Sequence, residues 1–137
     1  MQTILVAADA DYVRDDVVAA LAGDYEIITV TGGRAIRPIV AEHNVHMAVL
    51  DMQMGSMGGI AATMDLRLEE SGGRIGHVPV LLLLDRRADV FMARRAGAEG
   101  FLIKPISPLK LRRAVAALLE DGTYEDTART PSPVVAT

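Results

Sequence analysis

The chain has 137 residues, half of them hydrophobic but only 4% aromatic, so it can bury one aliphatic core in a single domain. It contains no cysteine, which excludes a disulfide framework and thiolate metal sites. The formal net charge of −4 argues against nucleic acid as the main partner.

The N-terminus has no basic segment before its short apolar run, and no apolar run approaches the length of a membrane span. We therefore expect a cytoplasmic protein. Charge is distributed unevenly: residues 85–113 carry a net charge of about +5, whereas the 84 residues before them sum to about −6. Such a basic segment is either a solvated helix face or a surface for an acidic partner, and the composition leaves both interpretations open.

Apolar runs bounded by turn residues predict strands that alternate with helices. The first strand covers residues 3–8 and is followed by a helix that begins near Asp11 and ends at Gly23. A run rich in β-branched residues predicts a second strand over residues 25–30, and a helix follows near residues 34–43.

The third predicted strand is an apolar run that ends at Asp51. Continuous apolar runs of this length are typical of strands that are buried on both faces of a parallel sheet. A glycine-rich loop then leads to a helix over residues 59–70, in which Ile60, Met64 and Leu68 lie on one face.

The most apolar segment of the chain comes next and predicts a central strand. The remaining elements are expected at residues 78–84 (this strand), 88–96 (helix), 100–103 (strand) and 108–120 (helix). Five strands and five helices in strict alternation indicate a doubly wound α/β sheet, formed by residues 1–121. Residues 122–137 are polar and proline-containing, so we expect a disordered C-terminal tail that is too short to be an output domain.

Reactive groups of an open parallel sheet are expected outside the carboxyl ends of its strands, and Asp51 lies at such an end. The glycine-rich loop after it follows the third strand and lacks the Gly-Lys-Ser/Thr of a phosphate-binding loop. No nucleophile–base pair is evident either. We therefore rank an enzyme last among the functional classes and expect none.

At this point the chain resembles a known family, the receiver domain of bacterial two-component response regulators of the chemotaxis-regulator type. The resemblance covers about residues 3–120. It rests on Ile4-Leu5-Val6 with Asp9 and Arg14, the Asp51 strand with Met57-Gly58-Gly59-Ile60, Pro79-Val80, and residues 96–105 ending in Lys104-Pro105. It implies a flavodoxin-like sheet of five parallel strands in the order 2-1-3-4-5 with five helices.

The resemblance also implies phosphoryl transfer to an aspartate in the presence of Mg²⁺. Asp51 matches the phospho-acceptor, and Lys104 matches the lysine that contacts the phosphoryl group. Asp9, Asp51 and the backbone carbonyl of Gln53 match the Mg²⁺ ligands.

Four positions depart from the receiver pattern. Ala8 stands where a second acidic residue is expected, which leaves a weak Mg²⁺ site at most. Leu84 stands where a Ser or Thr would hydrogen-bond the phosphoryl group, and the neighbouring Asp85 would repel that group if it faced inward. Gly55 replaces the usual proline, and Phe101 occupies the aromatic switch position without a tyrosine hydroxyl.

Two functional hypotheses follow. The first is a stand-alone, atypical receiver that signals through protein–protein interaction, with phosphorylation of Asp51 weak or absent. The alternative is a functional phospho-acceptor, either a single-domain response regulator or a phosphorelay shuttle, that uses Asp51, Asp9 and Lys104 with Mg²⁺.

In receivers, the fourth helix, fifth strand and fifth helix form the face used for dimerisation and output. Here that candidate interaction face would carry five basic residues: Arg94, Arg95, Lys110, Arg112 and Arg113. The expected partners are acidic proteins, a histidine kinase or a second copy of the chain. Nucleic acid is disfavoured because the basic residues are not interleaved with aromatic ones and no nucleic-acid-binding motif is present.

Overall fold

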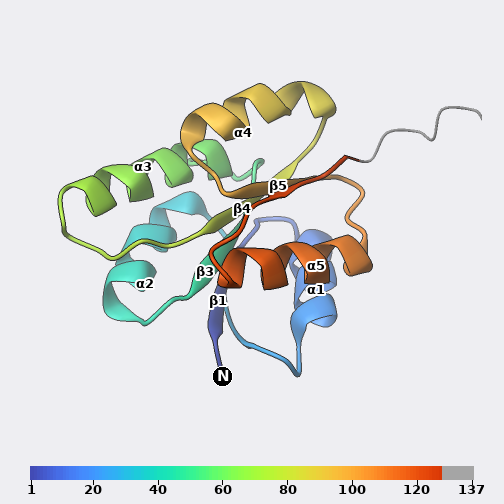
Figure 1. The fold of residues 1–137 in the computed structure, drawn as a ribbon, viewed down its shortest axis with the longest axis horizontal. Coiled ribbons are helices and arrows are strands. Elements are labelled where there is room, and N and C mark those ends of the chain that lie inside the picture. Colours follow the sequence, from blue (N-terminus) through green and yellow to red (C-terminus); the bar gives the residue numbers. More distant parts are fainter. Residues whose placement is uncertain (128–137) are drawn as a thin grey trace, which may run out of the picture.

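The structure of the chain is a computed structural model, and it describes residues 1–127. Its centre is a parallel sheet with the strand order β2-β1-β3-β4-β5-β6 (Figure 1). The strands are β1 (Thr3–Ala7), β2 (Glu26–Val30), β3 (Met47–Asp51), β4 (Val80–Leu84), β5 (Gly100–Ile103) and β6 (Tyr124–Glu125). The α-helices are α1 (Asp11–Leu21), α2 (Ile36–Glu42), α3 (Gly59–Ser71), α4 (Val90–Ala96) and α5 (Pro108–Leu119), and short 3₁₀ turns, η1 (Gly33–Ala35) and η2 (Arg87–Asp89), precede α2 and α4.

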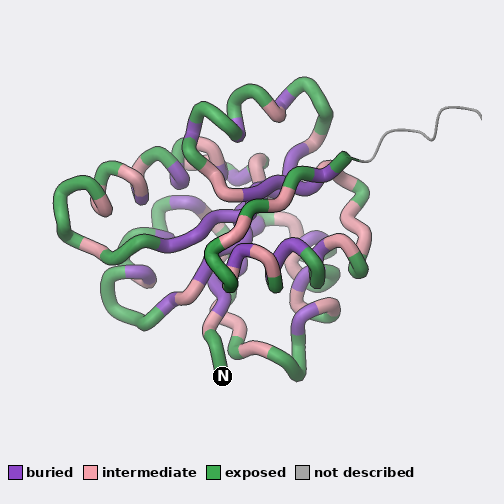
Figure 2. The backbone as a smooth tube through the Cα atoms, viewed as in Figure 1, coloured by how far each residue is buried: buried purple, intermediate pink, exposed green. Residues whose placement is uncertain are grey.

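The sheet forms where the sequence has its continuous apolar runs. Every residue of β3 and β4 is buried, as expected for central parallel strands that are covered by helices on both faces. Figure 2 shows these buried segments running through the middle of the molecule, between more exposed helices. The predicted order 2-1-3-4-5 is confirmed for the first five strands.

Helices cover the two faces of the sheet in separate layers. In Figure 1, α3 and α4 lie above the sheet, and α1 and α5 lie below it. Side chains of β4 alternate between the layers: Leu81 and Leu83 pack in the cluster that contains α1 and α5, whereas Leu82 and Leu84 pack in the cluster that contains α2, α3 and α4. Each strand therefore contributes to two apolar cores.

The C-terminal segment differs from the prediction, because the sheet has a sixth strand. Tyr124 and Glu125 pair in parallel with Gly100 and Phe101 of β5. Asp126 follows this strand and is only 3% exposed. The expected tail is therefore wrong for residues 122–127, which pack on the domain, and its remainder, residues 128–137, lies outside the described part of the chain.

Helix α3 also presents a different face to the sheet from the one that its large side chains suggested. Met64 and Leu68 are 53% and 67% exposed, respectively. The buried residues of α3 are small or centrally placed: Gly59, Ala62, Thr63 and Leu66. A Cβ atom on Gly59 would lie 2.6 Å from the carbonyl oxygen of Asp51, so the start of the helix approaches the sheet closely through a small residue, while Met64 and Leu68 point outward.

None of the helices formed by residues 1–127 combines the length and the apolar character that crossing a bilayer requires.

Candidate functional site

The fold places Asp51 and Lys104 in direct contact at the carboxyl edge of the sheet. Asp51 is the last residue of β3, and its side chain is only 2% exposed. Lys104 follows β5, and its backbone N–H donates to the carbonyl of Leu84 at 2.9 Å, which fixes the chain beside the end of β4. The Lys104 Nζ then lies 2.6 Å from Oδ1 of Asp51, which also accepts the backbone N–H of Gln53 at 3.1 Å.

A second carboxylate, that of Asp85, contacts the same ammonium group. Its Oδ1 lies 2.9 Å from Lys104 Nζ, so the lysine bridges two acids. Burial disfavours the charged form of Lys104, but its hydrogen bonds to Asp51 and Asp85 outweigh that effect and raise the pKa of Lys104. Burial likewise opposes ionisation of Asp85, yet hydrogen bonds with Lys104 and Gln53 outweigh it and lower the pKa of Asp85. Both groups are therefore charged at neutral pH.

Asp9 lies after β1 at the same edge of the sheet and is tied to the loop that follows β3. Its Oδ2 accepts the backbone N–H of Gly55 at 3.1 Å. A proline, which the resemblance to receivers leads us to expect at position 55, would have no N–H to donate, so this contact requires another residue there. The glycine also has open space around it, since a Cβ atom there would meet nothing within 4 Å.

The donor atoms at this edge fit Mg²⁺ only in part. Asp9, Asp51 and the Gln53 carbonyl supply oxygen, the atom type that Mg²⁺ prefers. Ala8, where the resemblance implies a second acidic residue beside Asp9, is fully buried, and its carbonyl accepts a hydrogen bond from Nη1 of Arg14 at 2.8 Å. Within residues 1–127, no group of three or more His, Cys, Asp or Glu side chains is arranged to hold a metal ion.

Position 84, where the resemblance to receivers implies a switch hydroxyl, is apolar and inaccessible. Leu84 ends β4, has no exposed surface and packs in the same apolar cluster as Phe101, which is 4% exposed. Neither side chain offers a polar atom to a group bound at Asp51. Asp85, the next residue, turns to Lys104 instead.

The basic residues of the predicted interaction face do not all lie together. Arg94 of α4 and Lys110 of α5 both contact the segment at β6, through Glu125 and Asp126 respectively. The guanidinium of Arg95 lies over the ring of Phe91, 5.7 Å from its centroid. Arg112 and Arg113 are exposed on α5.

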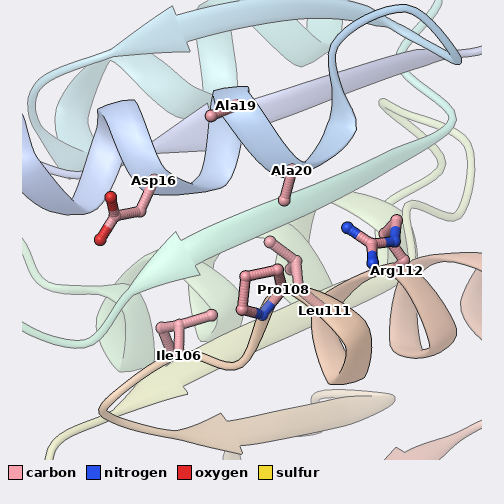
Figure 3. A pocket seen from close by; sticks show the side chains of 7 residues that line it. All are labelled: Asp16, Ala19, Ala20, Ile106, Pro108, Leu111 and Arg112. Atoms are coloured by element: carbon pink, nitrogen blue, oxygen red, sulfur yellow. The ribbon is translucent and has the colours of Figure 1, made fainter.

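Arg112 lies on a different side of α5, in a groove between α1 and the beginning of α5 (Figure 3). The groove has a volume of about 340 Å³, and Asp16 and Arg112 lie at its opposite ends. A second groove, of about 360 Å³, shares Asp16 and Ile106 with it and extends to Lys104. The predicted basic face is thus divided between the β6 side and the α1 side of α5.

Comparison with known proteins shows which family the chain belongs to. Residues 4–116 match the family model described as the response regulator receiver domain. The chain belongs to this family. As a receiver domain, it is a signalling module of two-component systems.

Three relatives illustrate the similarity. The receiver is 33% identical over 116 residues to "Two-component response regulator ORR3" of Oryza sativa subsp. indica, covering 80% of this chain and 85% of that protein. Its fold matches chemotaxis response regulator CheY4 of Vibrio cholerae with a TM-score of 0.75 at 23% identity, over 85% of this chain and 97% of the other. It also matches the signal receiver domain of a histidine kinase from Syntrophus aciditrophicus with a TM-score of 0.77 at 24% identity, over the full length of both chains.

Sequence reasoning missed two features of this receiver. The sequence predicts only repulsion from Asp85, although this residue follows β4 just as Lys104 follows β5, and the parallel pairing of Leu84 with Ile103 brings the two positions side by side. The acidic contacts of the C-terminal strand were missed because that strand has only two residues and no periodic pattern.

Proposed function

We propose that this receiver transmits its signal through protein–protein contacts, and that phosphorylation of Asp51 is weak or absent. The observation that carries this proposal is the position of Asp85. Its carboxylate lies 2.9 Å from the ammonium group that a phosphoryl group on Asp51 would need. Lys104 is therefore shared before any phosphoryl group arrives.

The charge balance argues in the same direction. A phosphoryl group adds a charge of about −1.5 to −2 at neutral pH. For a phosphoryl group about 5 Å from the Asp85 carboxylate, and an effective dielectric constant of about 20, each unit of that charge repels the carboxylate by about 3 kcal/mol. With one cationic side chain between two carboxylates, phosphorylation of Asp51 is opposed unless Asp85 moves away or is protonated.

The apolar end of β4 supports the second half of the proposal. The Leu84 side chain cannot accept or donate a hydrogen bond, so a phosphoryl group on Asp51 gains no contact there. Without that contact, the loop between β4 and α4 has no new partner in the phosphorylated chain, and a phosphorylation-dependent change of that loop lacks its usual driving interaction.

Mg²⁺ would supply positive charge beside Asp51 when bound. Asp9, Asp51 and the Gln53 carbonyl are the residues that would hold it. Asp9 already accepts the Gly55 N–H, and Asp51 already pairs with Lys104, so a cation must replace or accommodate these contacts. We therefore expect weak Mg²⁺ binding.

The second candidate function is a phospho-acceptor or phosphorelay shuttle. It is favoured by one specific observation, the 2.6 Å contact between Asp51 and Lys104, which keeps an acceptor carboxylate and a phosphoryl-binding cation together. Asp9 is also retained at the edge of the sheet.

Treatment of the full chain with acetyl phosphate and Mg²⁺, followed by intact mass measurement, distinguishes the two functions. We expect little modification of the wild type, and clearly more in Asp85→Asn, which releases Lys104 and removes the repelling charge. Asp51→Asn is the matched control and should stay unmodified. Stoichiometric phosphorylation of the wild type that disappears in Asp51→Asn would contradict our proposal and favour the phospho-acceptor.

A further inference from the structure

The outer edge of β5 is covered by the chain's own C-terminal strand. The backbone N–H of Tyr124 donates to the carbonyl of Glu99 at 3.1 Å, and that of Asp126 donates to the carbonyl of Phe101 at 3.2 Å. In Figure 1 this segment runs along β5 between α4 and α5. The backbone groups of an edge strand, which readily pair with another chain, are thus occupied in cis.

Two acidic side chains fasten this segment to the two flanking helices. Glu125 accepts two hydrogen bonds from Arg94 of α4, at 2.7 and 3.1 Å, in a bidentate pair. Asp126 pairs with Lys110 of α5 at 2.9 Å, and its other oxygen accepts the backbone N–H of Ile103 at 2.9 Å. The Asp126 carboxylate thereby takes the place that a strand carbonyl would have at the end of β5.

From this arrangement we propose that the edge of β5, between Arg94 and Lys110, is a binding site for an extended acidic segment of a protein partner, and that residues 124–126 occupy this site in the isolated chain. The inference deepens the proposed function, on which it rests, by naming the strand edge within the expected interaction face, the chemistry of the partner and the segment of this chain that competes with it. Backbone pairing with β5 would provide affinity, and the two cations would select acidic side chains.

The built-in occupant is short enough to be displaced. β6 has two paired residues, whereas β5 offers four, so a longer segment can continue the ladder past Phe101 to Ile103. The Arg94–Glu125 pair is exposed, and exposed pairs contribute little, about 0 to 1 kcal/mol. A partner segment that pairs with all of β5 would therefore add backbone pairing at Leu102 and Ile103, where residues 124–126 supply only the Asp126 carboxylate.

A competition experiment on the full chain tests this proposal. The variant Glu125→Arg/Asp126→Arg keeps the face intact but repels its own strand from Arg94 and Lys110. A fluorescent peptide with the sequence of residues 120–127 is titrated with each protein, and its anisotropy is measured. We expect the variant to bind the peptide at least about tenfold more tightly than the wild type does, because the site is vacated.

Two further variants locate the site. Adding Arg94→Glu to the released variant should abolish peptide binding at low salt, whereas adding Arg37→Glu, which makes the same charge change on α2, should leave it unchanged. Equal affinity for wild type and released variant, no binding to the released variant, or insensitivity to Arg94→Glu would each overturn the proposal.

Folding and self-association are checked in the same samples. If circular dichroism shows that the double-arginine variant is unfolded, Glu125→Gln/Asp126→Asn replaces it, with the same expected order of affinities. Sedimentation that shows wild-type chains dimerising by exchange of residues 124–126 would assign the face to a second copy and overturn the peptide assignment. Phosphorylation of Asp51 does not enter these measurements, so failure here leaves the proposed function to its own test.

Discussion

Replacement of Lys104 by methionine should destabilise this receiver far more than neutralisation of Asp51. Lys104→Met keeps most of the aliphatic stem and removes the ammonium group. The Asp51 side chain is only 2% exposed. Its carboxylate would keep the hydrogen bond from the Gln53 N–H at 3.1 Å but would lose its cation. Removing one partner of a buried pair costs about 3 to 5 kcal/mol. We expect about 3 kcal/mol, the lower end, because Asp85 is 30% exposed and can be solvated.

Asp51→Asn has a smaller expected cost, about 1 kcal/mol, because Lys104 keeps Asp85 as a partner and the amide oxygen can still accept a hydrogen bond. The double variant contains no buried carboxylate at position 51, so its expected cost is about 2 kcal/mol, less than that of Lys104→Met alone. The two substitutions should therefore be non-additive by about 2 kcal/mol.

Urea unfolding at neutral pH, followed by circular dichroism, measures all three variants against the wild type. For a domain of this length, the Lys104→Met substitution should also lower the melting temperature by about 10 °C. Equal costs for the two single variants, or additive costs in the double variant, would refute the idea that Lys104 compensates a buried charge.

Four other outcomes are expected. The difference in free energy of unfolding between wild type and Asp85→Asn should be constant near neutral pH. It should shrink as the pH falls from 3.8, the ordinary pKa of an aspartate, through the lowered pKa of Asp85. Urea titrations at successive pH values measure this difference. The contribution of Lys104 to the free energy of unfolding has the opposite pH dependence. It is complete below 10.5, the ordinary pKa of a lysine, and is lost as the pH rises through the raised pKa of Lys104. Gly59→Ala should cost about 1 to 3 kcal/mol in a chemical melt because its Cβ would meet the backbone at 2.6 Å, whereas the matched Gly55→Ala, in open space, should stay within about 0.5 kcal/mol of wild type. Leu84→Thr should lower the free energy of unfolding by about 1 to 3 kcal/mol, since it places a hydroxyl at a fully buried position, and a neutral effect in the same melt would mean that the hydroxyl finds a partner.

The first five strands could be predicted because each depends mainly on local sequence. A strand buried on both faces must be apolar throughout, so β3 and β4 are visible as uninterrupted runs. The sixth strand could not be predicted in this way. It is held by pairing with β5 and by ion pairs between Glu125 and Arg94 and between Asp126 and Lys110, which are 31 and 16 residues apart in the sequence.

The orientation of α3 shows a different limit. Ile60, Met64 and Leu68 form one stripe of large apolar residues, but the helix packs mainly through a second stripe of Gly59, Ala62, Thr63 and Leu66. Judged by hydrophobicity alone, the first stripe would be expected to face the sheet. Close approach of the helix to the sheet favours the second, and that distance follows from tertiary packing rather than from the helix itself.

The part of the candidate site that depends on where the strands end could be predicted from the sequence. Asp51 ends one buried strand and Lys104 follows another, and the topology of the sheet brings them together. The direction of the Asp85 side chain was not predictable from position alone, because a residue just after a strand can face either solvent or the neighbouring strand. Its pairing with Lys104 depends on where β5 ends.

The outward-facing side chains of α3 and α4 affect how the protein must be handled. Met64, Leu68, Phe91 and Met92 are each about half exposed or more, and Met64 and Met92 line the same pocket, which gives the folded molecule an apolar patch there. Dyes that fluoresce on contact with such patches would give a signal before any unfolding, and the chain has no tryptophan to serve as an intrinsic reporter. Ellipticity is therefore the better readout for melting curves, and low protein concentrations with mild non-ionic detergent should keep the patch from promoting self-association during purification.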